Sequence, residues 1–240
     1  MSIVLFVLAA VAWAVVLSMR DQGMPMETMP MSVSHGLMFV AGWAVMMTAM
    51  MLPSALPMIA LYGAILRGSA DPAPKGVPIA IFTLVYLAVW AATGVPVFVA
   101  QELLGALPQS VLSYGVAVIL LAAGAFQLSP LKQACLRACR SPLGFLLGRW
   151  RRGYIGSLLL GWSHSAYCLG CCWALMLVLV AAGAMGLPWV LLIAALVAAE
   201  KLLPGGEWIA RIAGGALVLL AVAVALRPDL VATLRGGHTM

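Results

Sequence analysis

Three cysteines and one histidine follow one another at helical spacing, in the pattern His164-x-x-x-Cys168-x-x-Cys171-Cys172. At about 100° per residue, a helix places all four on one face that is about 100° wide and about 12 Å long. Imidazole and thiolate groups bind zinc, copper and iron–sulfur clusters. Because one straight helix cannot close a tetrahedral site with all four, we expect a neighbouring helix to supply a further ligand.

Other roles are open to these four residues. A buried cysteine often serves as a small apolar side chain, and a histidine can simply hydrogen-bond to a neighbouring helix. The stretch is apolar enough to lie in a membrane, where ionisable side chains are costly and usually functional. Metal binding is therefore the favoured interpretation, and thiol redox chemistry is the second.

Methionines form another group of soft ligands. Of the 15 in the chain, eleven lie between Met19 and Met58, and residues 24–31 contain Met-Pro-Met twice. A thioether suits Cu(I) and cannot form a disulfide in an oxidising compartment. We therefore interpret residues 24–31 as an outer loop that collects metal, with Glu27 and His35 as harder ligands; the alternative is a flexible apolar loop. The methionines of this loop are Met24, Met26, Met29 and Met31.

The next apolar stretch contains two further pairs of methionines at i, i+4 spacing. They cover an arc of about 140° on a helix and form either a thioether path into the bilayer or, taken alone, ordinary packing. Pro53 and Pro57 are expected to interrupt this helix, and each frees a backbone carbonyl. Freed carbonyls in a membrane usually lie in protein or line a polar cavity, so a site or gate is expected here. The paired methionines are Met46, Met47, Met50 and Met51.

Two shorter motifs contain charged or nucleophilic groups. Cys135 and Cys139 are i, i+4 neighbours if this segment is helical, and the arginines at 137 and 140 favour their thiolate forms. This pair is a cytoplasmic metal hand-off point, a redox dithiol, or part of a basic segment at the lipid surface. Glu200 and Lys201 precede a helix-ending Pro-Gly-Gly. We expect Glu200 to act as a structural clamp with Lys201, Arg211 or an arginine of the basic segment.

The composition determines which elements position these groups. Hydrophobic residues make up 65% of the 240 residues and charged residues only 8%, against about 45–50% and about 25% in a soluble domain. A soluble enzyme, a nucleic-acid-binding domain and a disordered chain are therefore excluded. We predict an all-α, polytopic transmembrane helix bundle that forms one integral membrane domain over residues 1–240 and contacts the lipid bilayer.

Seven stretches are apolar and long enough to cross a bilayer. The basic loop at residues 130–152 is expected in the cytoplasm, which places the N-terminus inside and the C-terminus outside and accounts for the net charge of +6. The expected location is an inner (cytoplasmic) membrane that the chain crosses several times. We interpret the first stretch as an uncleaved anchor, with a cleaved signal sequence as the alternative. The seven stretches are residues 2–19, 36–66, 77–100, 110–128, 153–182, 187–203 and 208–226.

Four stretches together resemble a bacterial family named domain of unknown function 2182, which is described as predicted metal-binding integral membrane proteins. They are residues 43–57 with the paired methionines and prolines, 131–145 with Cys135 and Cys139, 164–176, and 200–206. Ser165 stands where the family usually has glycine, which leaves the ligand types intact. The resemblance implies metal binding in the membrane and supplies no established reaction.

The main hypothesis is an inner-membrane protein that handles a soft metal, with copper favoured and zinc as the alternative. The ion would pass from the outer loop along the methionines to the histidine and cysteines, and then to Cys135 and Cys139. A periplasmic metal chaperone or a membrane oxidase is the expected partner, and nucleic acid is not. No ATPase motif or catalytic residue is recognised, so an enzyme is not favoured.

Two other functions are kept open. One is a membrane thiol–disulfide carrier, although no Cys-x-x-Cys motif occurs in a thioredoxin-like context. The other is a non-catalytic subunit or assembly factor of a membrane complex, in which the cysteines only pack. In that case small residues would allow close helix contact, and the candidates are Gly156, Gly161, Gly214 and Gly215.

Overall fold

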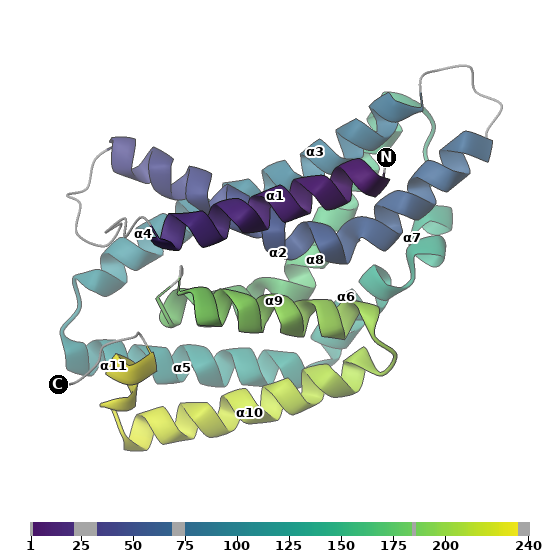
Figure 1. The fold of residues 1–240 in the computed structure, drawn as a ribbon. Helices are drawn as coiled ribbons and strands as arrows, with labels where there is room; N and C mark the ends of the chain where they lie inside the picture. Colours follow the sequence, from purple (N-terminus) through teal and green to yellow (C-terminus); the bar gives the residue numbers. More distant parts are fainter. Residues whose placement is uncertain (1, 22–32, 69–74, 184–185, 235–240) are drawn as a thin grey trace. The chain divides into compact units, whose positions relative to one another are not determined.

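The computed structural model describes residues 2–21, 33–68, 75–183 and 186–234. Within these ranges the regular secondary structure consists of helices, so the all-α prediction is confirmed. The helices are α1 (Ser2–Asp21), α2 (Val33–Gly68), α3 (Gly76–Ala92), α4 (Gly94–Gly105), α5 (Gln109–Leu128), α6 (Pro130–Arg140), α7 (Pro142–Arg149), α8 (Gly153–Ala181), α9 (Leu187–Leu202), α10 (Gly206–Leu226) and α11 (Leu230–Leu234) (Figure 1).

Five helical stretches of the described residues are long and apolar enough to cross a membrane, which indicates a multi-pass membrane protein. They match five of the seven expected spans within a few residues. The two others correspond to α1, which contains a shorter apolar stretch at Ile3–Ser18, and to α9, which has 16 residues. Whether α1 and α9 also cross stays a prediction. The five stretches are Val33–Gly68, Gly76–Gly105, Val111–Leu128, Gly153–Ala181 and Gly206–Leu226.

One expectation about local structure was wrong. Pro53 and Pro57 do not interrupt their helix, because α2 continues through both for 36 residues. A proline removes only one helical hydrogen bond, and neighbouring hydroxyl groups can donate to the backbone near it. The basic loop at 130–152 is mostly helical, since it contains α6 and α7. Its i, i+4 cysteines therefore lie on one helix.

The chain divides into two compact units. Unit 1 comprises Met1–Phe98 and Arg137–Leu169, and unit 2 comprises Val99–Leu136 and Gly170–Met240. The border between the units falls within α8, between Leu169 and Gly170. The predicted ligands of α8 are therefore divided between the two units.

Unit 1 is built around α2, which packs against α1, α3 and α7. The fully buried indole of Trp43 donates a 2.9 Å hydrogen bond from Nε1 to Thr93 Oγ1, between α3 and α4. A Cβ at Gly94 would lie 2.9 Å from the same indole. The small residue therefore lets α2 approach the junction of α3 and α4, which fixes α2 against this part of unit 1.

Unit 2 is a bundle in which α5, α9 and α10 lie side by side (Figure 1). Two glycines allow α5 and α10 to meet closely: a Cβ at Gly124 would lie 2.8 Å from the Gly214 carbonyl oxygen, and one at Gly214 would lie 3.0 Å from that of Gly124. Near the other end of the pair, Ser113 donates a hydrogen bond to the Pro228 carbonyl. These contacts make α5 and α10 antiparallel.

The outer faces of the apolar helices remain apolar. Ile3 on α1 is 77% exposed, Leu219 on α10 is 73% exposed, and Leu84 on α3 is also exposed. A protein that faces water rarely exposes contiguous apolar surface on this scale. The exposed faces therefore fit contact with lipid tails, as the composition predicts.

Candidate metal site

The four predicted ligands of α8 are all buried, with at most 3% of any side chain exposed. His164 and Cys168 belong to unit 1, whereas Cys171 and Cys172 belong to unit 2. A glycine explains how α8 comes close enough to its neighbour in unit 1: a Cβ at Gly161 would lie only 2.9 Å from the backbone oxygen of Phe82 on α3. The sequence thus brings α8 against α3 one turn before His164.

Aromatic rings surround His164. The imidazole is stacked on the rings of Phe82 and Tyr86, with centroids 5.7 Å and 5.5 Å away and interplanar angles of 29° in both cases. Phe145 of α7 meets it edge to face at 5.6 Å. These contacts hold the imidazole plane in one orientation, because turning the ring would collide with its neighbours.

Tyr86 connects Cys168 to α2. Its hydroxyl oxygen lies 3.1 Å from Cys168 Sγ and donates to the Met51 carbonyl oxygen at 3.2 Å. The same carbonyl accepts a 2.8 Å hydrogen bond from Ser54 Oγ. In unit 1, Tyr86 therefore lies between the backbone of Met51 and the thiol of Cys168, which are both predicted ligand residues.

The paired methionines of α2 lie in the interior. Met46, Met47, Met50 and Met51 are each at most 2% exposed. Because all four are buried, their burial fits both packing against neighbouring helices and binding of a metal ion inside the protein. The outer-loop methionines, Met24, Met26, Met29 and Met31, lie outside the described residues.

In unit 2 the two adjacent cysteines of α8 lie with their sulfur atoms 3.4 Å apart. Lys132 of α6 donates a 2.6 Å hydrogen bond from Nζ to the carbonyl oxygen of Cys171. A Cβ at Gly170 would lie 3.2 Å from Cys135 Sγ, so α6 places that thiol against α8 one residue before Cys171. Of the predicted cytoplasmic thiol pair, Cys135 is therefore the member that lies next to α8.

Glu200 forms a buried clamp, but with a partner that the sequence did not predict. Its Oε2 lies 2.6 Å from Lys132 Nζ, and its Oε1 accepts a 2.7 Å hydrogen bond from Gln127 Nε2. The expected partners were Lys201, Arg211 or an arginine. Lys132 takes this role because the first turn of α6 directs it inward, where both it and Glu200 are at most 1% exposed.

Sequence reasoning missed Phe82, Tyr86, Phe145 and Lys132. A signal for two of these was present, because Phe82, Tyr86 and Trp90 recur every four residues along α3 and are all buried. Such spacing gives one aromatic helix face. The contact of that face with His164 depends on tertiary packing, which the spacing does not encode.

The other predicted residues and groups are placed as follows. Cys139 lies one turn after Cys135 on α6, and both thiols are partly exposed. Arg149 of α7 lies over the ring of Tyr167 and donates to its hydroxyl at 2.7 Å. Gly161 and Gly214 make close helix contacts as expected, whereas a Cβ at Gly215 would meet nothing within 4 Å.

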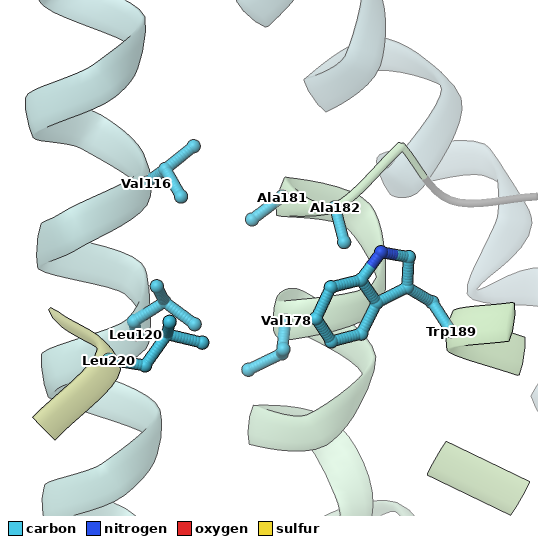
Figure 2. Close-up of a pocket in the computed structure, with 7 residues that line it drawn as sticks. All are labelled: Val116, Leu120, Val178, Ala181, Ala182, Trp189 and Leu220. Carbon is cyan, nitrogen blue, oxygen red and sulfur yellow. The ribbon is translucent and has the colours of Figure 1, made fainter. Parts of the chain in front are cut away.

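A small pocket in unit 2 has no metal-binding character. It is lined by Val116, Leu120, Val178, Ala181, Ala182, Trp189 and Leu220 (Figure 2). Figure 2 shows aliphatic side chains and one indole around it. None of the predicted metal ligands lines this pocket.

The predicted ligands along α8 are one imidazole and three thiols. Among the described residues, no three side chains of the types His, Cys, Asp and Glu come together in a way that could hold one metal ion. A thioether is not one of those types, so methionine ligands stay outside this statement.

The comparisons with known proteins agree with this chemistry. No curated protein and no solved structure matches the chain. Residues 40–224 match the family model described as "PpoB2: Copper chaperone". That range is more than half of the chain and includes every predicted ligand named above except the outer-loop methionines, Glu27 and His35. It is compatible with the metal-related resemblance noted in the sequence. The chain belongs to the PpoB2 copper chaperone family.

Proposed function

We propose that this protein binds Cu(I) within the inner membrane of a bacterium and delivers it to a copper-requiring enzyme at that membrane. The observation that carries the proposal is the ligand face of α8, whose imidazole and thiols are buried and held by their neighbours. His164 stacks on two aromatic rings, and the Cys171 turn is held by Lys132. Soft ligands of this kind select Cu(I).

The proposed path of the ion uses the remaining soft groups. Met24, Met26, Met29 and Met31 collect the ion outside, and the buried methionines of α2 pass it to His164 and Cys168. Cys171 and Cys172 form a second position for the ion on the same helix. Cys135 and Cys139 are the exit on the cytoplasmic side, and a periplasmic metal chaperone is the expected donor.

The thiol–disulfide alternative has little support at the adjacent cysteines. Consecutive Cα atoms are about 3.8 Å apart, whereas disulfides usually need about 4.4–6.8 Å. Cys171 and Cys172 follow each other directly within α8, and all five cysteines are free thiols. A pair fixed on one helix in this way is better suited to hold a cation than to cycle between thiol and disulfide.

Metal analysis of the purified protein tests the proposal. Wild-type protein in detergent is loaded with Cu(I) under reducing conditions, desalted, and analysed for copper and zinc. The same procedure is applied to the triple variant His164→Ala/Cys168→Ser/Cys171→Ser. We expect the wild type to retain copper and the triple variant to lose it, because three soft or borderline ligands are removed.

Ser165→Ala is the matched control, because its hydroxyl bonds only to the Gly161 carbonyl of its own helix, at 2.7 Å. It should retain copper as the wild type does. Equal, near-zero copper and zinc in the wild type and the triple variant would overturn the proposal. Retention of zinc in place of copper would replace Cu(I) by zinc as the bound ion.

A further inference from the structure

Tyr86 touches both predicted ligands of α8 in unit 1 and is itself fully buried. Its ring stacks on His164 with centroids 5.5 Å apart, and its hydroxyl lies 3.1 Å from Cys168 Sγ. The same hydroxyl donates to the Met51 carbonyl at 3.2 Å.

The hydrogens along this chain of contacts can be assigned. A phenol carries one hydrogen, and Tyr86 directs it to the Met51 carbonyl, which can only accept. The contact between Tyr86 and Cys168 then needs a hydrogen from the thiol. The arrangement that satisfies both contacts at once has Cys168 S–H donating to Tyr86 Oη, and Tyr86 O–H donating to Met51 O.

A metal ion on Cys168 changes this arrangement. When Cu(I) bonds to the sulfur, the S–H bond breaks and its proton leaves to water or buffer; no electron is transferred. The metal-bound sulfur has no hydrogen, so it can only accept. The hydrogen of Tyr86 is then the one available for their contact. The Met51 carbonyl still accepts from Ser54 Oγ at 2.8 Å.

We propose that Tyr86 is a positioning residue of the copper site, which orients His164 through its ring and moves its hydroxyl hydrogen from Met51 O to Cys168 Sγ when Cu(I) binds. This proposal rests on the function proposed above. It also links the binding of Cu(I) at Cys168 to the backbone of α2 at Met51, two residues before Pro53. The site and the methionine helix are thereby coupled through one hydroxyl group.

The test compares Tyr86→Phe with Tyr62→Phe in the full-length protein. Tyr62 is an equally buried tyrosine of unit 1 whose hydroxyl bonds to Ser157 at 2.8 Å. Each variant loses one buried hydroxyl and keeps its ring, but only Tyr86 contacts the predicted ligands. Cu(I) affinity is measured by competition with a chromophoric Cu(I) chelator. We expect Tyr86→Phe to bind about tenfold more weakly than wild type, and Tyr62→Phe to bind normally.

A spectroscopic measurement separates positioning from a general loss of stability. The infrared difference spectrum between Cu(I)-loaded and metal-free protein, with isotope-labelled tyrosine, should contain a tyrosine band in wild type and in Tyr62→Phe. That band should be absent in Tyr86→Phe. Thermal unfolding in detergent checks that both variants are folded, and Tyr86→Leu, which also loses the ring, should bind more weakly than Tyr86→Phe.

The outcomes distinguish the two proposals. If wild type binds Cu(I) and His164→Ala/Cys168→Ser does not, but Tyr86→Phe matches wild type in affinity and spectrum, the role of Tyr86 is wrong and the copper site stands. If wild type and the double ligand variant bind equally, the copper site itself is wrong.

Discussion

Lys132 is a buried cation of unit 2 that forms hydrogen bonds with both α8 and α9. Its ammonium group bonds to the Cys171 carbonyl and to Glu200, each at 2.6 Å. A fully buried ion pair contributes little net stability against an apolar replacement, but removing one partner leaves an uncompensated charge. Its presence beside a predicted ligand turn fits a role in fixing that turn.

Lys132→Met is expected to destabilise the protein by about 3–5 kcal/mol, because the buried carboxylate of Glu200 loses the ammonium group that lies 2.6 Å away. The measurement is the thermal unfolding midpoint of the purified protein in detergent. Lys132→Met/Glu200→Leu should recover most of the loss, since it removes both charges. No recovery in the double variant would contradict this explanation.

The control uses the exposed ion pair of the same unit. Arg227 Nε lies 3.5 Å from Asp229 Oδ2, and both side chains are at least 70% exposed. Water screens such a pair, so Arg227→Gln should leave the unfolding midpoint almost unchanged. A drop as large as that of Lys132→Met would mean that charge loss anywhere in unit 2 is destabilising.

At the scale of elements, close packing in unit 2 depends on glycine where helices meet backbone to backbone. Leucine-sized side chains fill other helix contacts, but Gly124 and Gly214 face each other's carbonyl oxygens across α5 and α10. Without a hydrophobic force between helices in lipid, association depends on such packing. The sequence-based suggestion that small residues serve close contact therefore holds for Gly214 and does not hold for Gly215.

Gly124→Ala is expected to destabilise the protein by about 1–3 kcal/mol, because the new Cβ would lie 2.7 Å from Val218 Cγ2 and 2.8 Å from the Gly214 oxygen. The helices must then separate. Gly215→Ala on α10 is the matched control, with nothing within 4 Å of its Cβ, and should be neutral or slightly stabilising. Thermal unfolding in detergent compares the two; equal effects would refute the close-packing account.

At the scale of the whole molecule, the contacts inside unit 2 bear on the number of membrane spans. The C-terminal end of α9 lies at the α5–α6 junction, where Glu200 meets Gln127 and Lys132. The N-terminal end of α9 lies near the start of α5, where Trp189 and Val116 line the same pocket (Figure 2). Thus α9 runs along α5, which favours a crossing helix despite its 16 residues.

A C-terminus outside the cytoplasm is the expected result if α1 and α9 both cross. A phosphatase fused after Met240 of the full chain should then be active, and a fluorescent protein at the same position should be dark. If the basic segment 130–152 is inside but α9 does not cross, α10 returns the chain to the cytoplasm. The two reporters would then give the opposite result.

Much of the architecture was predictable because composition and periodicity are local. Residues 153–182 were expected as one apolar span, and α8 covers Gly153–Ala181. That His164, Cys168, Cys171 and Cys172 lie on one helix also followed from spacing. The continuity of α2 through Pro53 and Pro57 was not predicted, because a proline removes only one helical hydrogen bond and the packing of a long helix can offset that loss.

The sequence by itself determined the class of protein, most helix boundaries and which predicted ligands share one helix, because hydrophobicity and helical period act within a single segment. Only the tertiary structure decided which groups surround those ligands. Tyr86 lies 82 residues from Cys168, and Lys132 lies 68 residues from Glu200. Contacts at such separations arise from helix packing, which satisfies buried polar groups with whichever donor the fold brings within reach.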